Sequence, residues 1–386
     1  MNVLFDHQAF EMQSHGGVSR CFAELYSHRS ETLNAEISVL ETDNVYLQAL
    51  GFMKSGDTYR GFMGIKDSPL KHMLFKLVYN AKYGYYSRWD RKPNLNLYES
   101  IDRLRKGCFD IFHPTFFDGY FLDYLGDKPL VVTVHDMIPE LYPMYYSRDD
   151  IQIRQKQLVI PRASHIVAVS EQTKADLVRI MGIDENRISV VYHGTDETPY
   201  SPSHACVKDY EYILYVGERH FYKNFAAFCR DCIPILKRHR DLKVICTGKP
   251  FTMEEIYFFD VYGMKDRFVH IFVETTQELL DLYHNAMTFV YPSEYEGFGI
   301  PILEAYKADC PVMLNRASCF PEIAGDAAVY FSMNRCESDF EEHFETLYHL
   351  DGNERAGLIA RQRERLKKFS WTLSVQRLEN VYRSII

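Results

Sequence analysis

Short apolar runs rich in β-branched and aromatic residues alternate with amphipathic helical stretches along nearly the whole chain. This alternation predicts parallel sheets wrapped by helices, because parallel strands need helix-length crossovers. In the first half, the predicted strands are Asn2–Phe5, Glu36–Leu40, Asp110–His113, Leu130–His135, His165–Val169 and Ile188–Tyr192. The predicted helices of this half are Arg20–His28, Ile151–Arg162 and Gln172–Met181.

The alternation breaks once, over Thr195–Glu211, which contains Pro199 and Pro202 and is typical of a linker. Beyond it, the predicted strands are Tyr212–Val216, Leu242–Cys246, Phe268–Phe272, Met287–Tyr291, Pro311–Leu314 and Ala328–Phe331. The predicted helices are Phe225–His239, Gln277–Asn285, Pro301–Lys307, Asp339–His349 and the closing Trp371–Ile386. Because 386 residues exceed one ordinary core, we predict two Rossmann-like α/β domains facing each other across a cleft.

The charge of the chain is unevenly distributed. Its net charge of −9 argues against nucleic-acid binding. Residues 51–107 nevertheless carry twelve Lys or Arg against five Asp or Glu, a net +7, so the remainder carries −16. Aromatic residues are interleaved with these cations, and residues 71–79 have the pattern of a basic amphipathic helix. We predict that this segment docks on an anionic inner membrane leaflet; the alternatives are a solvated basic face or a surface for an anionic glycan.

Cysteine usage and hydropathy indicate a cytoplasmic protein. The nine cysteines are odd in number and scattered, as expected of reduced thiols. Asp6 cuts short the apolar opening Asn2–Phe5, and no apolar run reaches about 18 residues. We therefore expect neither a secretory leader nor a membrane span.

The strongest motif is Tyr295–Ala305, a glycine-rich loop that follows a predicted strand and opens a helix with Pro301 in its first turn. Free backbone N–H groups and the dipole at such a helix start favour an anion. Glu296 and Glu304 flank this anion site, and carboxylates accept paired hydrogen bonds from sugar diols. The motif predicts a ligand with both phosphates and hydroxyls, unless Glu304 merely stabilises the helix start.

A second motif, Tyr215–Asn224, places Arg219 and Lys223 in a loop after a predicted strand. A leaving diphosphate needs positive charge as its bond to a sugar breaks. Because no Asp-x-Asp accompanies this loop, we predict that the two cations substitute for a metal ion. A plain exposed basic turn is the alternative.

Weaker signals come from the first half of the chain. Gly16 and Gly17 follow the first predicted strand, where small residues let the backbone approach a phosphate, although a tight turn would explain them equally well. His135 ends a very apolar run and is predicted to face the cleft, unless it caps its strand locally. His113 and His193 also end strands, and for these we favour a structural role.

Several motifs are absent from the sequence. It has no P-loop, no complete G-x-G-x-x-G, no G-x-S-x-G and no His/Cys cluster with metal-ligand spacing. Cys229 and Cys232 form one C-x-x-C, which lies in a helical pattern without a second pair. These absences disfavour an NAD-dependent oxidoreductase and predict an enzyme without a metal or a resident cofactor.

Together these residues resemble the retaining family-4 glycosyltransferases of the GT-B fold. The resemblance is strongest to the mannosyltransferase-like branch that builds bacterial lipid-linked surface polysaccharides such as O-antigen or capsule, and it covers nearly the whole length. The segments that carry it are Phe5–Gln8, Gly16–Arg20, Val134–Asp136, Tyr215–Gly217, Arg219, Tyr222–Asn224, Pro292–Ser293, Glu296–Ala305, Phe320–Asp326 and Phe369–Trp371.

The resemblance implies an acceptor-side domain over residues 1–196 and a donor domain over residues 197–369. It also implies that the closing helix, residues 370–386, crosses back onto the first domain. The donor would be a nucleotide-diphosphate sugar, with GDP-mannose favoured. The acceptor would be a glycan or a lipid-linked glycan.

The resemblance further implies roles for single residues. Glu296 would contact hydroxyls of the transferred sugar, and Glu304 the ribose. Arg219 and Lys223 would hold the diphosphate, although many family members space these cations five apart rather than four. His135 would contact the sugar near the reacting carbon. Backbone groups that approach the donor would be those of Gly16, Gly17, Phe298, Gly299 and Ile300.

Two further alternatives belong to other classes. A non-catalytic sugar-binding scaffold subunit would have lost a charged site residue, and none is missing. A phosphorylase-like enzyme on the same fold would transfer the sugar to free phosphate instead.

Overall fold

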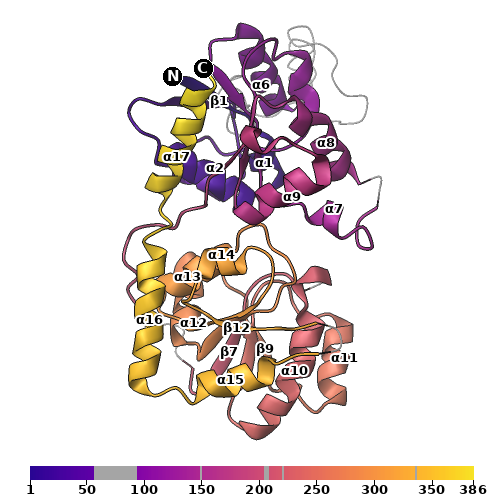
Figure 1. The fold of residues 1–386 in the computed structure, drawn as a ribbon, viewed down its shortest axis with the longest axis vertical. Helices are drawn as coiled ribbons and strands as arrows, with labels where there is room; N and C mark the ends of the chain where they lie inside the picture. The colour runs from indigo at the N-terminus through magenta and orange to yellow at the C-terminus, as the bar shows by residue number, and fades with distance from the viewer. Residues whose placement is uncertain (56–93, 148–149, 204–207, 220, 335–336) are drawn as a thin grey trace, which may run out of the picture.

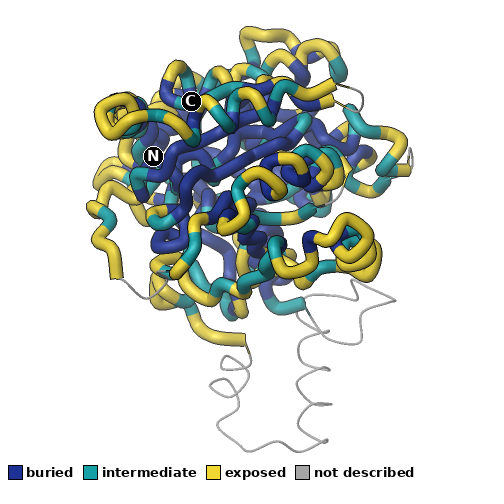
Figure 2. The backbone as a smooth tube through the Cα atoms, turned by 90° about the horizontal axis from the view of Figure 1, so that it is seen from below, coloured by how far each residue is buried: buried dark blue, intermediate teal, exposed yellow. Residues whose placement is uncertain are grey.

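The structure of the protein is a computed structural model. It describes residues 1–55, 94–147, 150–203, 208–219, 221–334 and 337–386. They form two α/β lobes stacked along the long axis, and both ends of the chain lie on the first lobe (Figure 1). Figure 2 shows a buried interior surrounded by more exposed backbone, and most strand residues belong to the buried part.

The described part of the first lobe contains six parallel strands. Their bounds are β1 (Asn2–Phe5), β2 (Asn34–Ile37), β3 (Ile111–His113), β4 (Val131–Val134), β5 (His165–Ala168) and β6 (Ile188–Val190). They form two three-stranded sheets, β2-β1-β3 and β4-β5-β6. A parallel bridge between Phe112 and Leu130 joins β3 to β4, so the two sheets form one continuous layer.

The second lobe has one six-stranded parallel sheet. Its strands are β7 (Tyr212–Tyr215), β8 (Lys243–Cys246), β9 (Phe268–His270), β10 (Thr288–Tyr291), β11 (Val312–Asn315) and β12 (Val329–Phe331). The strand order is β12-β11-β10-β7-β8-β9. The order reverses between β7 and β10, as it does between β1 and β3 in the first lobe, and ligands of doubly wound sheets bind at such switch points.

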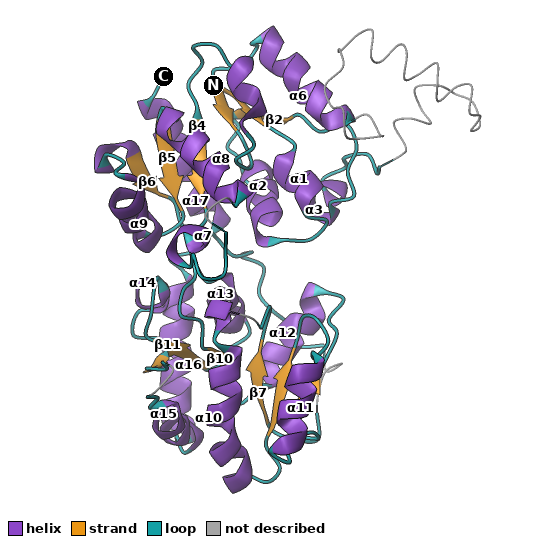
Figure 3. Cartoon of the chain, turned by 90° about the vertical axis from the view of Figure 1, so that its right-hand side faces the viewer, coloured by secondary structure: helices purple, strands orange, loops and turns teal. Residues whose placement is uncertain are grey.

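Helices cover both sheets (Figure 3). In the first lobe they are α1 (Gln8–Met12), α2 (Gly17–Ser27), α3 (Val45–Ala49), α6 (Leu95–Lys106), α7 (Ile138–Leu141), α8 (Ile151–Val159) and α9 (Glu171–Met181). In the second lobe they are α10 (Phe225–Arg238), α11 (Met253–Val261), α12 (Thr276–Asn285), α13 (Ile300–Lys307), α14 (Phe320–Ala324), α15 (Phe340–Tyr348) and α16 (Gly352–Leu366). Short 3-10 turns, including η4 (Phe221–Lys223), complete the lobes.

The last helix, α17 (Trp371–Ser384), returns to the first lobe and packs against α2. Trp371 and Tyr382 are buried there, and the Tyr382 hydroxyl lies 2.6 Å from Nδ1 of His113. The chain passes Gly194 on the way, where a Cβ would stand 2.2 Å from the Trp371 amide nitrogen. This crossing confirms the predicted fold class of two facing Rossmann-like domains with a closing helix.

The two lobes also touch directly. The Ser170 hydroxyl, which caps α9 of the first lobe, donates to the Gly297 carbonyl of the second lobe at 2.6 Å. The Glu322 carboxylate accepts from the Glu171 amide at 2.7 Å, and the Tyr295 hydroxyl donates to Asp176 at 2.7 Å. Helix α9 is therefore held by the loop that carries Tyr295 and Gly297 and by α14 of the second lobe. Among the described helices, none is both long and apolar enough to cross a membrane.

Candidate functional site

Several of the predicted site residues follow β1, β7 and β10, the strands at the switch points of the two sheets. Gly16 and Gly17 follow β1 across the short α1, Arg219 and Lys223 follow β7, and Glu296 follows β10. The three segments, distant in sequence, come together where the two lobes meet, since Lys223 contacts Glu296 and Gly17 lies beside Ile300. We call this boundary between the lobes the cleft. A ligand bound there would contact both lobes.

Two helix starts face each other across this cleft. The helix α2 begins at Gly17 and α13 begins at Ile300, and a Cβ on Gly17 would stand 3.9 Å from Cδ1 of Ile300. The first N–H groups of each helix have no partner within the helix, and each start carries partial positive charge. The arrangement is suited to an anionic ligand held from both sides.

Glycines allow the loops to approach this closely. A Cβ on Gly297 would stand 1.8 Å from the His135 carbonyl oxygen, so only glycine fits between the lobes at this point. Gly299 has φ of +96°, a left-handed conformation that glycine adopts at little cost. Both positions fix the loop that carries Glu296.

Glu296 is paired with a cation. It is only 8% exposed, and its Oε1 accepts from the Lys223 ammonium at 2.7 Å. The Ser318 hydroxyl donates to the Glu296 carbonyl at 2.7 Å and fixes the backbone. A carboxylate and an ammonium held side by side can recognise sugar hydroxyls and phosphate oxygens of one ligand.

Glu304 meets a cation from the opposite lobe. The Arg20 guanidinium of α2 donates to Glu304 Oε1 at 3.1 Å, across the two facing helix starts. Burial raises the pKa of Glu304, while Arg20 and the nearby Tyr283 hydroxyl act in the opposite direction. The Glu304 carboxylate is thus held by a guanidinium of the other lobe.

Arg219 has other partners. Its guanidinium donates to Glu255 at 3.0 Å and to the carbonyls of Thr247 and Pro250 at 3.2 and 2.8 Å, and its side chain is 6% exposed. The structure therefore does not bring Arg219 together with the pair of Lys223 and Glu296. The guanidinium is held by Glu255 instead.

His135 lies at the centre of the contact between the lobes. Its ring stacks on His193 with centroids 5.5 Å apart, and its Nε2 has no hydrogen-bond partner. Burial lowers the pKa of His135 to about 4, so the imidazole is neutral near pH 7. Phe298 packs edge-on against His193 at 4.9 Å and turns its side chain into the lobe contact.

One residue of the candidate site, Arg20, was not predicted as functional. Arg20 stands within the Gly16–Arg20 motif, and an arginine one turn after a Gly-Gly helix start is the only signal that marks it. His193 was expected to be structural, and it joins His135, Phe298 and Trp371 in one buried contact. The other histidine, His113, is satisfied by Tyr382 and Thr133, as its structural role requires.

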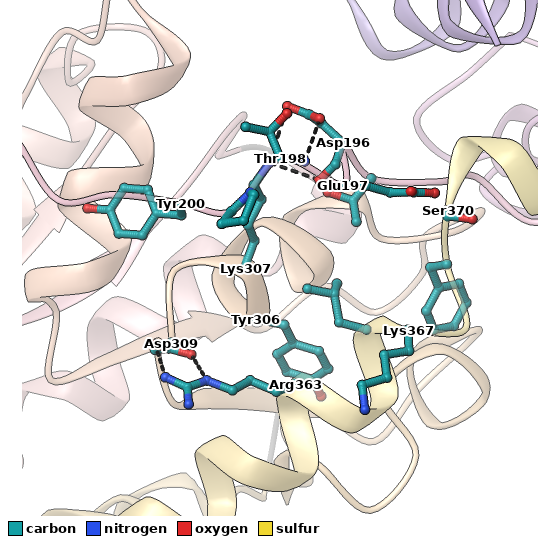
Figure 4. A pocket seen from close by; sticks show the side chains of 14 residues that line it. Asp196, Glu197, Thr198, Tyr200, Tyr306, Lys307, Asp309, Arg363, Lys367 and Ser370 are labelled. Carbon is teal, nitrogen blue, oxygen red and sulfur yellow. Dashed lines mark hydrogen bonds and ion pairs between the residues drawn. The ribbon is translucent and has the colours of Figure 1, made fainter.

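A cavity of about 620 Å³ lies elsewhere (Figure 4). The linker, the end of α13 and the end of α16 line it. Its charged side chains pair with one another, as Lys307 does with Asp196 and Arg363 with Asp309. This cavity contains none of the predicted site residues.

Within the described ranges, no group of three or more His, Cys, Asp or Glu side chains could hold a metal ion. Cys229 and Cys232 are both buried in the core of the second lobe. Most of the basic segment 51–107, including the predicted amphipathic helix at residues 71–79, lies outside the described residues.

Two doubly wound domains that face each other and hold charged loops at their switch points define the GT-B class of enzyme. Matches to known families agree. Residues 72–198 match the model "Glycosyltransferase Family 4", and residues 196–365 match "Glycosyl transferases group 1". The chain therefore belongs to the glycosyltransferases of the GT-B fold, with a family-4 first domain.

Among curated relatives, the O-antigen chain mannosyltransferase B of Escherichia coli is 26% identical over 66% of this chain and 70% of its own length. The O-antigen chain mannosyltransferase RfbU of Salmonella typhimurium is 27% identical over 53% of this chain, and the alignment spans 61% of that relative. A glycosyltransferase from Rickettsia africae has the same fold, with a TM-score of 0.68 at 15% identity over 100% and 98% of the two chains. Anabaena HepE, solved with UDP and glucose, also has a TM-score of 0.68 at 15% identity, covering 99% of both chains.

Proposed function

We propose that this enzyme transfers mannose from GDP-mannose, with retention of configuration, to a growing lipid-linked polysaccharide. The observation that carries the proposal is the pair of carboxylates on either side of the α13 start. Glu296 is held by Lys223, and Glu304 is held by Arg20 from the opposite lobe. The two relatives described above as O-antigen mannosyltransferases support mannose and a surface polysaccharide.

In this proposal the donor lies between the two helix starts. Glu304 binds the ribose, and Glu296 binds hydroxyls of the transferred mannose. Lys223 and Arg219 hold the diphosphate together with backbone amides at the starts of α2 and α13, without a metal ion. Because these groups stabilise the charge that develops on the leaving diphosphate, they lower the barrier to sugar transfer.

The reacting centre has no side chain assigned as a nucleophile. The departing phosphate takes the proton of the incoming acceptor hydroxyl on the same face of the sugar. The new glycosidic bond forms as the bond to the diphosphate breaks, which retains the configuration. The neutral His135, with its free Nε2, contacts the mannose near this carbon.

We also propose that the enzyme works in the cytoplasm, on the inner face of a membrane. The support is the net +7 of residues 51–107 in a chain of −9. The protein should sediment with vesicles rich in anionic lipid and be released at roughly 0.5 M salt, where screening lengths are a few Å. Reversing Lys71, Lys76 and Lys82 to Glu should abolish this binding. If the wild type does not sediment with anionic vesicles at low salt, the docking proposal is wrong.

A screen of nucleotide sugars tests the donor assignment. GDP-mannose should raise the unfolding temperature and be slowly hydrolysed, whereas UDP-glucose, UDP-galactose and UDP-N-acetylglucosamine should do neither. Preference for a UDP-sugar would overturn the proposed donor. Release of mannose 1-phosphate on addition of free phosphate would instead show a phosphorylase.

A further inference from the structure

Aromatic rings from both lobes meet beside the Lys223–Glu296 pair. Tyr142 and Tyr145 follow α7, at the face of the first lobe that looks toward the second (Figure 1). Phe221 and Tyr222 belong to η4, which follows β7. Tyr145 stacks on Phe221 with centroids 4.4 Å apart, and Tyr142 lies 5.5 Å from Tyr222. We call these four residues the bridging aromatic cluster.

Phe221 is both exposed and strained. The residue is 49% exposed, and its backbone φ is +53°. A bulky residue in the left-handed region is an outlier that costs free energy, and such strain persists mainly where a function requires it. Neither burial nor backbone preference accounts for a phenylalanine at this position.

The cluster is continuous with the donor site. Tyr222 precedes Lys223, whose ammonium lies 2.7 Å from Glu296, and the Tyr222 carbonyl accepts from the Glu294 amide at 2.7 Å. An acceptor must reach the carbon held between these groups. Aromatic side chains offer rigid, largely apolar faces at low entropic cost, which suits the C–H face of a pyranose ring.

We propose that the bridging aromatic cluster is the subsite for the pyranose ring of the acceptor. This inference rests on the proposed function, since it takes Lys223 and Glu296 to mark the reacting carbon. The rings stack on one another in this structure, and the proposed acceptor sugar would replace part of the stacking between the lobes. Because each lobe supplies half of the rings, the subsite is complete only when the lobes are together.

The experiment separates use of the acceptor from use of the donor. α-1,3-Mannobiose serves as the probe acceptor, with GDP-mannose as donor. In Phe221→Ala and Tyr145→Ala, the KM for mannobiose should rise tenfold or more, while hydrolysis of GDP-mannose without acceptor falls less than threefold. Phe221→Trp should restore the KM, because it keeps an aromatic face, whereas Phe221→Leu should not. The matched control is Tyr257→Ala, which removes a 71% exposed ring from α11 of the same lobe and should change neither quantity.

An unchanged KM for mannobiose in both alanine variants would overturn the proposal. Equal losses of hydrolysis and transfer would also overturn it, because they would make the cluster a structural latch between the lobes. Saturation-transfer NMR of mannobiose, with GDP present, gives a readout that needs no turnover. If the wild type hydrolyses no nucleotide sugar, the proposed donor fails, yet a mannobiose signal that is lost in Phe221→Ala would still support the subsite. No signal with the wild type would contradict it.

Discussion

The guanidinium of Arg20 and the carboxylate of Glu304 meet across the cleft at 3.1 Å, although 284 residues separate them in the chain. The pair joins the start of α2 to the start of α13, so it couples the contact between the lobes to the residue proposed to bind the ribose. A donor that engages Glu304 must share it with Arg20 or replace it.

Arg20→Ala should weaken GDP binding about tenfold, or ~1.4 kcal/mol, because it leaves a partly buried carboxylate without its cation. Arg20 lowers the pKa of Glu304, so its removal should raise that pKa and leave more of the carboxylate protonated at low pH. The loss of GDP affinity should therefore be larger at pH 5.5 than at pH 8. Calorimetry at both pH values measures this difference. Arg103→Ala removes a cation paired with Glu36 and Glu99 on the same lobe and serves as the control. A pH-independent effect would show that Arg20 does not act through Glu304.

The two carboxylates should have separable roles. Glu296→Gln keeps the shape but weakens acceptance of sugar hydroxyls, so kcat with GDP-mannose should fall about 10²-fold while GDP affinity changes little. Glu304→Gln should weaken bare GDP about tenfold, because its partner is the ribose. Titrations with GDP that give equal affinities for both variants and the wild type would reject this division.

Arg219 provides a test of the donor charges. Deleting either Arg219 or Lys223 should cost about 3–4 kcal/mol of transition-state stabilisation in kcat/KM. If Arg219 must leave Glu255 to reach the diphosphate, Glu255→Gln should tighten GDP binding. Glutamine retains the cap that Glu255 gives the α11 start. Weaker GDP binding by Glu255→Gln would mean that Arg219 stays on Glu255 and positions the loop.

Buried histidines predict how stability depends on pH. Burial lowers the pKa of His113 to about 3 and of His135 to about 4, and it lowers that of His193 well below 6.5. The unfolded chain, with histidine pKa near 6.5, then binds more protons than the folded chain as the pH falls toward 4. The free energy of unfolding should be highest above pH 6.5 and fall below it, by up to about 1.4 kcal/mol per pH unit for each histidine.

Urea unfolding at pH 7.5, 6.5 and 5.5 measures this slope. His113→Gln should reduce the slope, whereas His349→Gln, which changes a side chain that is 72% exposed, should not. A stability that does not fall between pH 6.5 and 5.5 would contradict neutral burial of the three residues.

The alternation of strand and helix was sufficient to predict each strand of both sheets within a few residues, because parallel strands are short apolar runs bounded by polar ends. Among the described helices, the longer α6, α11 and α16 and the short α1, α3, α7 and α14 were not predicted. The helix α16 is polar around most of its surface, and α11 exposes apolar residues such as Ile256 and Tyr257, so neither has a clear apolar stripe.

Of the predicted site residues, Gly17, Lys223, Glu296 and Glu304 lie where the lobes meet, whereas Arg219 is held by Glu255. Their partners could not be predicted in the same way. Arg20 reaches Glu304 because the two lobes meet there, and Glu255, at the start of α11, reaches Arg219 in the loop after β7. Such pairs depend on three-dimensional packing, and the spacing of residues in a single sequence does not predict them.

The most direct test of the central claim is an NMR time course of GDP-mannose with the purified protein in EDTA, without added divalent metal. The account predicts that GDP-mannose is consumed and that the first mannose released to water is the α anomer, before it equilibrates. Glu296→Gln should slow this reaction about 10²-fold. Consumption that needs Mg²⁺, or release of the β anomer first, would contradict the account.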